Sequence, residues 1–381
     1  MERKNTAGTG LMLFALWLVP AAAQMMKLAG PGGLAALALA ALGGIGFLLW
    51  LVQKRPDWPG TAGFAVLALA LAAVFLVVFP LANSHAPGLG SDRDDALNTG
   101  VAALLDGRWP YGERTYLGNP LTPLPGALLI ALPFHLIGNA AFQNLLWAAL
   151  FIGWCRRRIV PGGAAWLAAA LVTLGSPGAL QDFAVGGDYL ANALYVTMAA
   201  DLALRVQTGG RWARLAGGMV LAIAVSSRPV YAVVPVVLAG TIFRSQGAAR
   251  SGLFVAVTGV VLLALNLPFA LADPGNFPLG IALSKLGSGQ SADVLRIVLP
   301  GLALLIAGAA FVLPPDAPGP LALIAAALAV MFYGPVAQQV LAGLAFSDWI
   351  RTVAYALPVS VMGTVVVLAR RRERMQRDGL V

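Results

Sequence analysis

Long apolar runs recur along this chain from Leu11 to Leu368, and only short stretches of Arg, Pro or Gly interrupt them. A bilayer core needs roughly 20 apolar helical residues per crossing, and only helices or closed barrels satisfy their backbone hydrogen bonds in lipid. These runs are too long and too continuous for the alternating strands of a barrel. With 59% hydrophobic and 11% charged residues, the chain is predicted to be an all-α, polytopic membrane protein.

We expect about twelve crossings, and the whole chain, 1–381, is expected to form one integral membrane domain. The first apolar run resembles a signal peptide because small residues precede Gln24, but an uncleaved first helix is expected. The crossings are placed at about 11–26, 33–52, 62–82, 139–155, 162–176, 189–206, 214–227, 229–243, 251–271, 294–313, 320–343 and 351–369.

The charges orient these crossings. The net charge is +9, and with a cytoplasmic N-terminus most basic residues fall on the cytoplasmic side. Examples are Lys54, Arg55, the run 156–158 and the C-terminal run 370–374. This distribution follows the positive-inside rule. It therefore predicts a plasma-membrane protein with both termini in the cytoplasm, and the basic balance does not indicate a nucleic-acid partner.

An external loop, 83–138, is expected to hold the functional site. Within it, Leu97, Val101 and Leu105 recur at helical spacing, which predicts an amphipathic surface helix at 94–106. Asp94 continues the apolar stripe and should point inward. The segment 123–138 is expected to dip into the outer leaflet without crossing, because the arginines at 156–158 must return to the cytoplasm.

Three carboxylates crowd the start of this helix: Asp92, Asp94 and Asp95. A capping box from Ser91 to Asp94 would account for one or two of them. Three like charges so close cost energy unless a cation, a substrate or a raised pKa relieves them. The cluster is therefore a candidate catalytic site. A divalent cation is possible there, and no other cofactor is expected, since the chain has no P-loop or HExxH motif and only two histidines.

Four cations are candidates for binding an anion at the outer face. Arg228 lies between two apolar segments, each of which is too short for a full crossing of the bilayer core. An arginine within the bilayer costs about 2.5–3.5 kcal/mol, which favours an anionic partner such as a phosphate. Snorkelling to the headgroups is the alternative. Lys285, Arg351 and Arg114 are further candidates, because cations are scarce in the predicted outer loops.

Aromatic residues of the same loop can contact a sugar. Trp109, Tyr111 and Tyr116 suit a membrane-interface belt, and they suit stacking against a sugar ring equally well. Asp188, in a later outer loop, is a further candidate for binding the acceptor or its sugar. Most other loop acids, including Asp182, are expected to be solvated. Asp201 is predicted to pair with Arg205 one turn later.

The external loop resembles that of GT-C glycosyltransferases, which are integral membrane enzymes that use polyprenyl- or dolichyl-phosphate sugars. In the mannosyltransferases of this group a D-x-D motif heads a surface helix, followed by "G..PY" and a Thr-Tyr, proline-rich segment. Here these elements are Asp92-Arg93-Asp94, then Gly107 with Pro110-Tyr111, then Thr115-Tyr116 and the segment 121–124. The chain departs from the pattern in having three apolar segments before the loop.

The resemblance implies a GT-C-like fold and transfer of mannose, or another hexose or pentose, from a polyprenyl phosphate to a lipid, glycolipid or polysaccharide acceptor with inversion. It implies that Asp92 or Asp94 is the base and that Asp95 orients the acceptor or tunes its neighbours. Arg228, Lys285 and Arg351 would hold the phosphate. The alternative is a transporter or lipid-carrier flippase, although such proteins usually place ionisable groups at the midplane.

Overall fold

A computed structural model describes residues 2–83, 92–286, 292–313, 319–345, 353 and 355–377. The structure is 82% helix, and the described residues form no strand, only an isolated bridge between Arg114 and Pro120. The all-α prediction is therefore confirmed. The helices are α1 Glu2–Lys54, α2 Gly60–Ala82, α3 Arg93–Leu105, α4 Pro125–Leu136, α5 Gln143–Arg158, α6 Gly162–Val172, α7 Pro177–Ala184, α8 Tyr189–Arg205, α9 Arg211–Val225, α10 Val233–Gln246, α11 Ala248–Ala272, α12 Pro278–Ser284, α13 Ala292–Gly308, α14 Pro320–Leu341 and α16 Leu357–Arg377.

Several helices are long and apolar enough to cross a membrane. Length and composition identify five among the described residues, or up to seven if each of two bent helix pairs counts as one span. The five are Ala29–Lys54, Gly60–Ala82, Ala248–Ala272, Asp293–Phe311 and Pro320–Leu341. Less than half of each apolar window is buried inside the protein, as expected for helices that face lipid.

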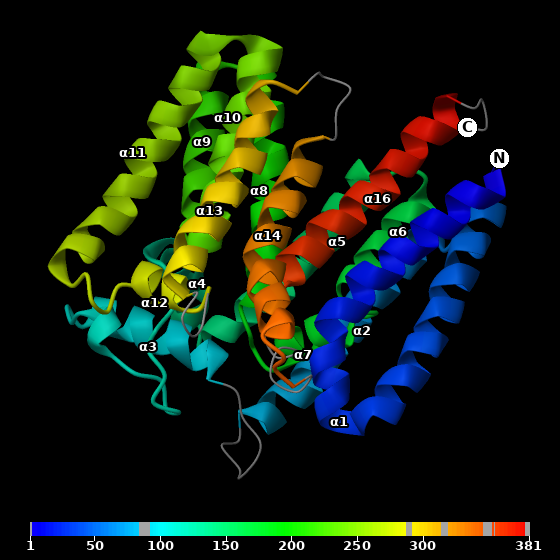
Figure 1. Ribbon diagram of the computed structural model, residues 1–381, viewed down its shortest axis with the longest axis horizontal. Coiled ribbons are helices and arrows are strands. Elements are labelled where there is room, and N and C mark those ends of the chain that lie inside the picture. Colours follow the sequence, from blue (N-terminus) through cyan, green and yellow to red (C-terminus); the bar gives the residue numbers. More distant parts are fainter. Residues whose placement is uncertain are drawn as a thin grey trace.

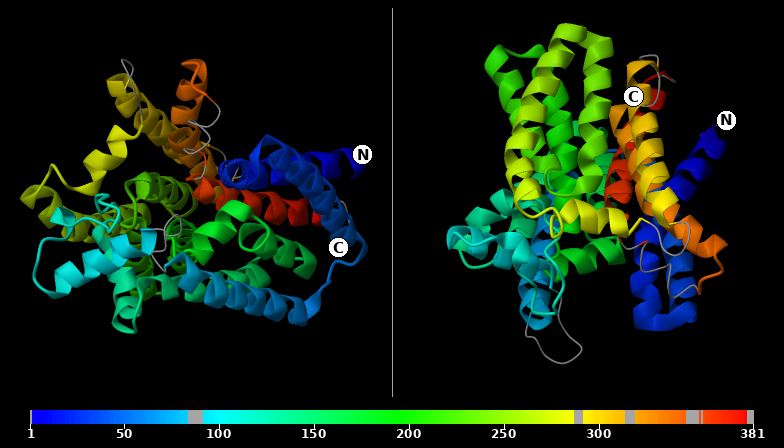
Figure 2. Two further views of the ribbon diagram at one scale, coloured as in Figure 1. Left: turned by 90° about the horizontal axis from the view of Figure 1, so that it is seen from below. Right: turned by 60° about the vertical axis from the view of Figure 1, so that its left-hand side comes forward.

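The helices form an elongated bundle with a distinct layer across one end. Helices α8 to α11 pack side by side, and α13 pairs with α14 at the flank of the bundle (Figures 1 and 2). Helix α3 lies across one end and packs against α4 (Figure 1). The start of α1 and the end of α16 lie on the same side of the molecule, away from α3 (Figures 1 and 2). Residues predicted to lie in outer loops are thus gathered around α3.

Helix α1 contains two apolar arms joined by a sharp break. Gly30 adopts φ 65°, a left-handed conformation inside an otherwise helical run. Glycine adopts this conformation without the steric cost that a Cβ imposes. The two arms correspond to the first two expected crossings, and the connection between them is shorter than the predicted loop.

The predicted surface helix is present as α3. It begins at Arg93, one residue before the expected start, and its end is followed by Gly107 at φ 70°. Its N-cap is Asp92, whose side chain makes no capping hydrogen bond. The alternative of a capping box from Ser91 to Asp94 depends on Ser91, which lies outside the described residues.

Helix α4 makes a sharp angle with α5 and packs against the turn after α9. The two helices meet at 102°, the geometry of a broken span or a re-entrant loop. Leu124 N donates to Ser227 O at 3.1 Å, and Gly126 N donates to Ser226 Oγ at 3.2 Å. A Cβ on Gly126 would lie 2.3 Å from Ile223 O. The close approach of α4 to this turn therefore requires glycine.

A second group of charges lies at the far ends of α5 and α8. Asp201 pairs with Arg205 at 3.2 Å, which confirms the predicted contact between successive turns. Arg158 also binds Asp201, at 2.5 Å, and Trp154 Nε1 donates to the same carboxylate at 3.0 Å. Sequence spacing within one helix could not reveal these two partners from α5.

We predict that Gly126→Ala destabilises the fold by about 1–3 kcal/mol, the usual cost of forcing extra atoms into a packed site. Gly153→Ala is the matched control, because a Cβ at this exposed position of α5 meets nothing within 4 Å. Thermal unfolding in detergent can be followed with a thiol-reactive fluorogenic dye, since the single cysteine, Cys155, is buried in the fold. Equal unfolding temperatures for the two variants would contradict the packing argument.

Candidate functional site

Two of the three clustered carboxylates hold the loop that follows α3. Asp92 Oδ2 accepts hydrogen bonds from Thr115 Oγ1 at 2.7 Å and from Asn119 Nδ2 at 2.6 Å. Asp95 Oδ2 accepts from the Tyr116 backbone N at 2.7 Å. These charge-assisted bonds fold residues 115–119 back over the start of α3. Asp92 and Asp95 therefore have structural partners that the sequence did not reveal.

Asp94 points inward, as predicted, and only 4% of it is exposed. Its Oδ2 accepts a hydrogen bond from Asn139 Nδ2 at 3.3 Å, whereas its Oδ1 is buried with no hydrogen-bond partner. Burial disfavours the charged carboxylate and raises the pKa of Asp94 to about 6. A buried, half-satisfied carboxyl group with a pKa near neutrality is a candidate general base.

Arg228 forms a buried ion pair with Asp188. The two residues are 8% and 1% exposed, and Arg228 Nη2 lies 2.5 Å from both carboxylate oxygens. Arg228 Nη1 donates to Thr122 Oγ1 at 2.6 Å, and the guanidinium lies 4.6 Å from the centre of the Tyr189 ring. The prediction that Asp188 contacts an acceptor from a solvated loop is corrected here: its carboxylate is occupied by Arg228.

A second ion pair packs against the ring of Tyr189. Arg93 donates to Asp182, which is fully buried and also accepts from Leu190 N at 2.8 Å. The Arg93 guanidinium lies 5.2 Å from the Tyr189 ring centre and 5.9 Å from that of Tyr355. The sequence had suggested that Asp182 is a solvated loop residue. That prediction is wrong, because its carboxylate is buried. Tyr189 was missed altogether, because an aromatic beside a loop acid carries no specific signal.

The loop between α7 and α8 brings these groups next to Asp94. Gly186 has φ 78°, and a Cβ on it would lie 3.1 Å from the Cβ of Asp94. The next glycine, Gly187, packs directly against the Asp182 carboxylate. Asp94 and the two ion pairs are thus parts of one contiguous site at the α3 end of the bundle.

Lys285 follows α12, whose residues pack near the turn that carries Arg228. Burial and the positive charge of Arg228 lower the pKa of Lys285. Among the described residues, no carboxylate forms an ion pair with Lys285. Arg114 is exposed and forms only the backbone bridge to Pro120. Arg351 lies outside the described residues.

The two tyrosines of the loop have different environments. Tyr111 is 1% exposed, donates its hydroxyl to Pro123 O at 3.1 Å and packs edge-on against Phe269 and Phe277. It presents no ring face to a ligand in this structure, contrary to the expected stacking role, because it fills an aromatic core beneath the loop. Tyr116 is 43% exposed and remains available at the surface.

The described residues do not provide a metal site. No group of three or more His, Cys, Asp or Glu side chains within them lies close enough to hold a metal ion. The three acids at the start of α3 diverge, since Asp92 and Asp95 face the loop and Asp94 faces the interior. The donor set therefore does not fit the divalent cation that the sequence had left possible.

Comparison with known proteins adds no relative. No protein-family model, curated protein or solved structure matches the chain. Its function is therefore inferred from its residues and their geometry.

We predict that Asp94→Asn stabilises the protein at pH 8 and not at pH 3. Folding raises the pKa of Asp94 from 3.8 to about 6. Ionisation of Asp94 therefore destabilises the folded state fully when the pH is above 6, and not at all when the pH is below 3.8. This shift corresponds to about 3 kcal/mol at pH 8. Unfolding temperatures measured at both pH values provide the check. The exposed Asp106→Asn is the control and should change little at either pH.

Proposed function

We propose that this protein is a GT-C-type glycosyltransferase. It moves a sugar, mannose or another hexose or pentose, from a polyprenyl-phosphate donor to a lipid, glycolipid or polysaccharide acceptor, with inversion. One observation supports this most: a buried carboxyl group with an unused oxygen, Asp94, lies beside two arginine–aspartate pairs whose carboxylates are buried, at one end of an apolar helical bundle. Lys285 is a charged neighbour of one of these arginines, Arg228. A lipid-borne donor suits such a site because its chain remains in the bilayer.

The proposed topology has about twelve crossings in a plasma membrane. The α3 end faces outward and both termini face the cytoplasm. The arginines at the end of α5, residues 156–158, lie at the opposite end of that helix from its junction with α4. This arrangement agrees with the positive-inside rule. The helix pair α4 and α5 then forms one crossing, with α4 dipping into the outer leaflet.

In the proposed reaction, the Asp94 carboxylate removes the proton from an acceptor hydroxyl. The acceptor oxygen bonds to the anomeric carbon from the face opposite the phosphate. The bond between that carbon and the phosphate oxygen breaks, and its electron pair leaves with the polyprenyl phosphate. A positioned base contributes typically about 10²–10⁴-fold, and nearby cations stabilise the charge that develops on the leaving phosphate.

The structure changes the order of the phosphate candidates. Arg228 already pairs with Asp188 through both carboxylate oxygens, so its positive charge is largely neutralised. Lys285 has no such partner among the described residues, and Arg228 acts on it as a neighbouring positive charge. Lys285 is therefore assigned the first contact with the phosphate, with Arg228 behind it.

The activity test offers purified protein a panel of short-chain polyprenyl-phosphate hexoses and pentoses and measures released polyprenyl phosphate. With the accepted donor, Asp94→Asn should lower turnover by about 10²-fold or more, the contribution of a general base. Asp106→Asn, exposed beyond the C-terminal end of α3, should retain wild-type turnover.

Full activity in a folded Asp94→Asn variant would refute Asp94 as the base. If no donor is cleaved but the protein moves a polyprenyl-phosphate sugar across vesicle membranes, the alternative of a lipid-carrier flippase is correct instead.

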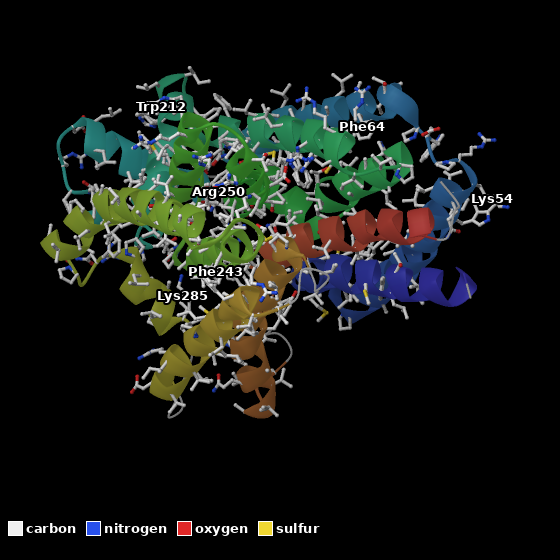
Figure 3. The ribbon with its side chains drawn as sticks, turned by 90° about the horizontal axis from the view of Figure 1, so that it is seen from above. Lys54, Phe64, Trp212, Phe243, Arg250 and Lys285 are labelled. Carbon is white, nitrogen blue, oxygen red and sulfur yellow. The ribbon has the colours of Figure 1, made fainter. Side chains whose placement is uncertain are left out.

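A labelling experiment tests the orientation. Tyr116→Cys places a thiol on the exposed loop over α3. Trp212→Cys places one at the start of α9, where the Trp212 side chain is 81% exposed and lies at the edge of the molecule in Figure 3. The turn that carries Arg228 follows the other end of α9. A membrane-impermeant maleimide added to intact cells should label only the first variant. Labelling of Trp212→Cys alone would reverse the proposed topology.

A further inference from the structure

A chain of side-chain hydrogen bonds connects His135 to Asp94. His135 occupies the last turn of α4, and its Nδ1 lies 3.0 Å from Asn98 Oδ1. Asn98 Nδ2 lies 3.0 Å from Asn139 Oδ1 and also 3.0 Å from the backbone O of Asp94. Asn139 Nδ2 then donates to Asp94 Oδ2 at 3.3 Å. Two amide side chains and three hydrogen bonds therefore link the imidazole ring to the carboxylate.

Backbone donors fix the direction of every bond in this chain. Ala140 N donates to Asn98 Oδ1 at 2.9 Å, and Ala141 N donates to Asn139 Oδ1 at 2.8 Å. A flipped amide would place an NH₂ group against a backbone N–H, so neither asparagine can turn over. Because Asn98 Oδ1 can only accept, His135 Nδ1 must carry a hydrogen and donate it. All three links therefore point their donors toward Asp94.

This order determines which oxygen of Asp94 is available. Asn139 occupies Oδ2, whereas Oδ1 has no partner. A base needs a free oxygen held in one orientation, since a misplaced catalytic group loses much of its effect. A carboxylate without the Asn139 contact could rotate and exchange the roles of its two oxygens.

We propose that His135 is a positioning residue for Asp94: by donating from Nδ1 it holds Asn98 and Asn139 in place, so that Asp94 keeps Oδ2 bonded and Oδ1 free to take the acceptor's proton. This role rests on the proposed function. The histidine itself does not touch the substrate and acts only through the two amides. Lipid-facing helices offer few such polar chains, because each polar group requires a partner.

The surroundings of Asp94 make the effect of this chain measurable. On α3, Asp95 is the charged neighbour that raises the pKa of Asp94, whereas the bond from Asn139 lowers it. The α7–α8 loop approaches Asp94 through Gly186, which is not titratable. The two carboxylates that flank this glycine, Asp182 and Asp188, are paired with Arg93 and Arg228. His135 is the titratable group at the α4 end of the chain. Weakening the hydrogen bond from Asn139 should therefore raise the pKa of Asp94.

The first measurement leaves the site unmodified. The chain has two histidines, so His85→Gln leaves His135 as the only one. Nitrogen NMR of the ¹⁵N-histidine-labelled protein at pH 9, where an ordinary imidazole is neutral, should show the tautomer that carries hydrogen on Nδ1. The tautomer protonated on Nε2 alone would overturn the proposal, because its Nδ1 cannot donate to Asn98.

The second measurement compares two variants. His135→Leu removes the donor, whereas His135→Asn places an amide Nδ2–H where the imidazole Nδ1–H was. In each background, the pH dependence of the unfolding temperature is measured with Asp94 and with Asp94→Asn, and the difference gives the titration midpoint of Asp94. His135→Leu should raise this midpoint by about 0.5–1 pH unit, the equivalent of one hydrogen bond. His135→Asn should retain the wild-type midpoint.

Turnover separates this proposal from the proposed function. With an accepted donor, His135→Leu should lower kcat by about 10-fold with little change in KM, and His135→Asn should recover most of the loss. An unchanged Asp94 midpoint in folded His135→Leu, or a midpoint in His135→Asn as high as in His135→Leu, would overturn the positioning role. If the midpoint shifts as expected but no donor is cleaved, the positioning role stands and the glycosyltransferase proposal fails.

Discussion

The ion pair between Arg228 and Asp188 holds together the end of the bundle on which the site depends. Both groups are buried, and removing one partner of such a pair typically costs about 3–5 kcal/mol because the other charge is left unsolvated. The pair joins the loop before α8 to the turn after α9. Arg228 also donates to Thr122, in the segment that leads into α4. One guanidinium therefore connects three separate parts of the chain.

Periodicity predicted the local features of the site, and its limits explain what was missed. The apolar stripe through Leu97 and Val101 located α3 and turned Asp94 inward, because residues three and four apart share a helix face. The need of Arg228 for an anionic partner also followed from its apolar surroundings. The identity of that partner did not, since Asp188 lies 40 residues away and its flanking glycines resemble those of a solvated loop.

The crowding of three carboxylates was the strongest signal in the sequence, and the structure resolves it without a metal. Asp92 and Asp95 are satisfied by hydroxyl, amide and backbone donors of the following loop. Of the three, only Asp94 has a buried oxygen without a hydrogen-bond partner. Asp92 and Asp95 thus shape the loop. Of the three acids, Asp94 alone bears the energetic cost of burial, and it is the one proposed as the base. Sequence spacing alone could not divide these roles, because it does not show which donors fold back on α3.

The separation of Thr122 from Arg228 affects how the protein is made. Their hydrogen bond spans 106 residues, and Gly126 meets Ser226 across 100. At synthesis rates of about 5–20 residues per second, the loop between α3 and α4 is made roughly 5–20 s before the residues that anchor it. During that interval its carboxylates have only local partners. Assembly of the site is therefore a late event in biosynthesis, completed only after the turn between α9 and α10 has been synthesised.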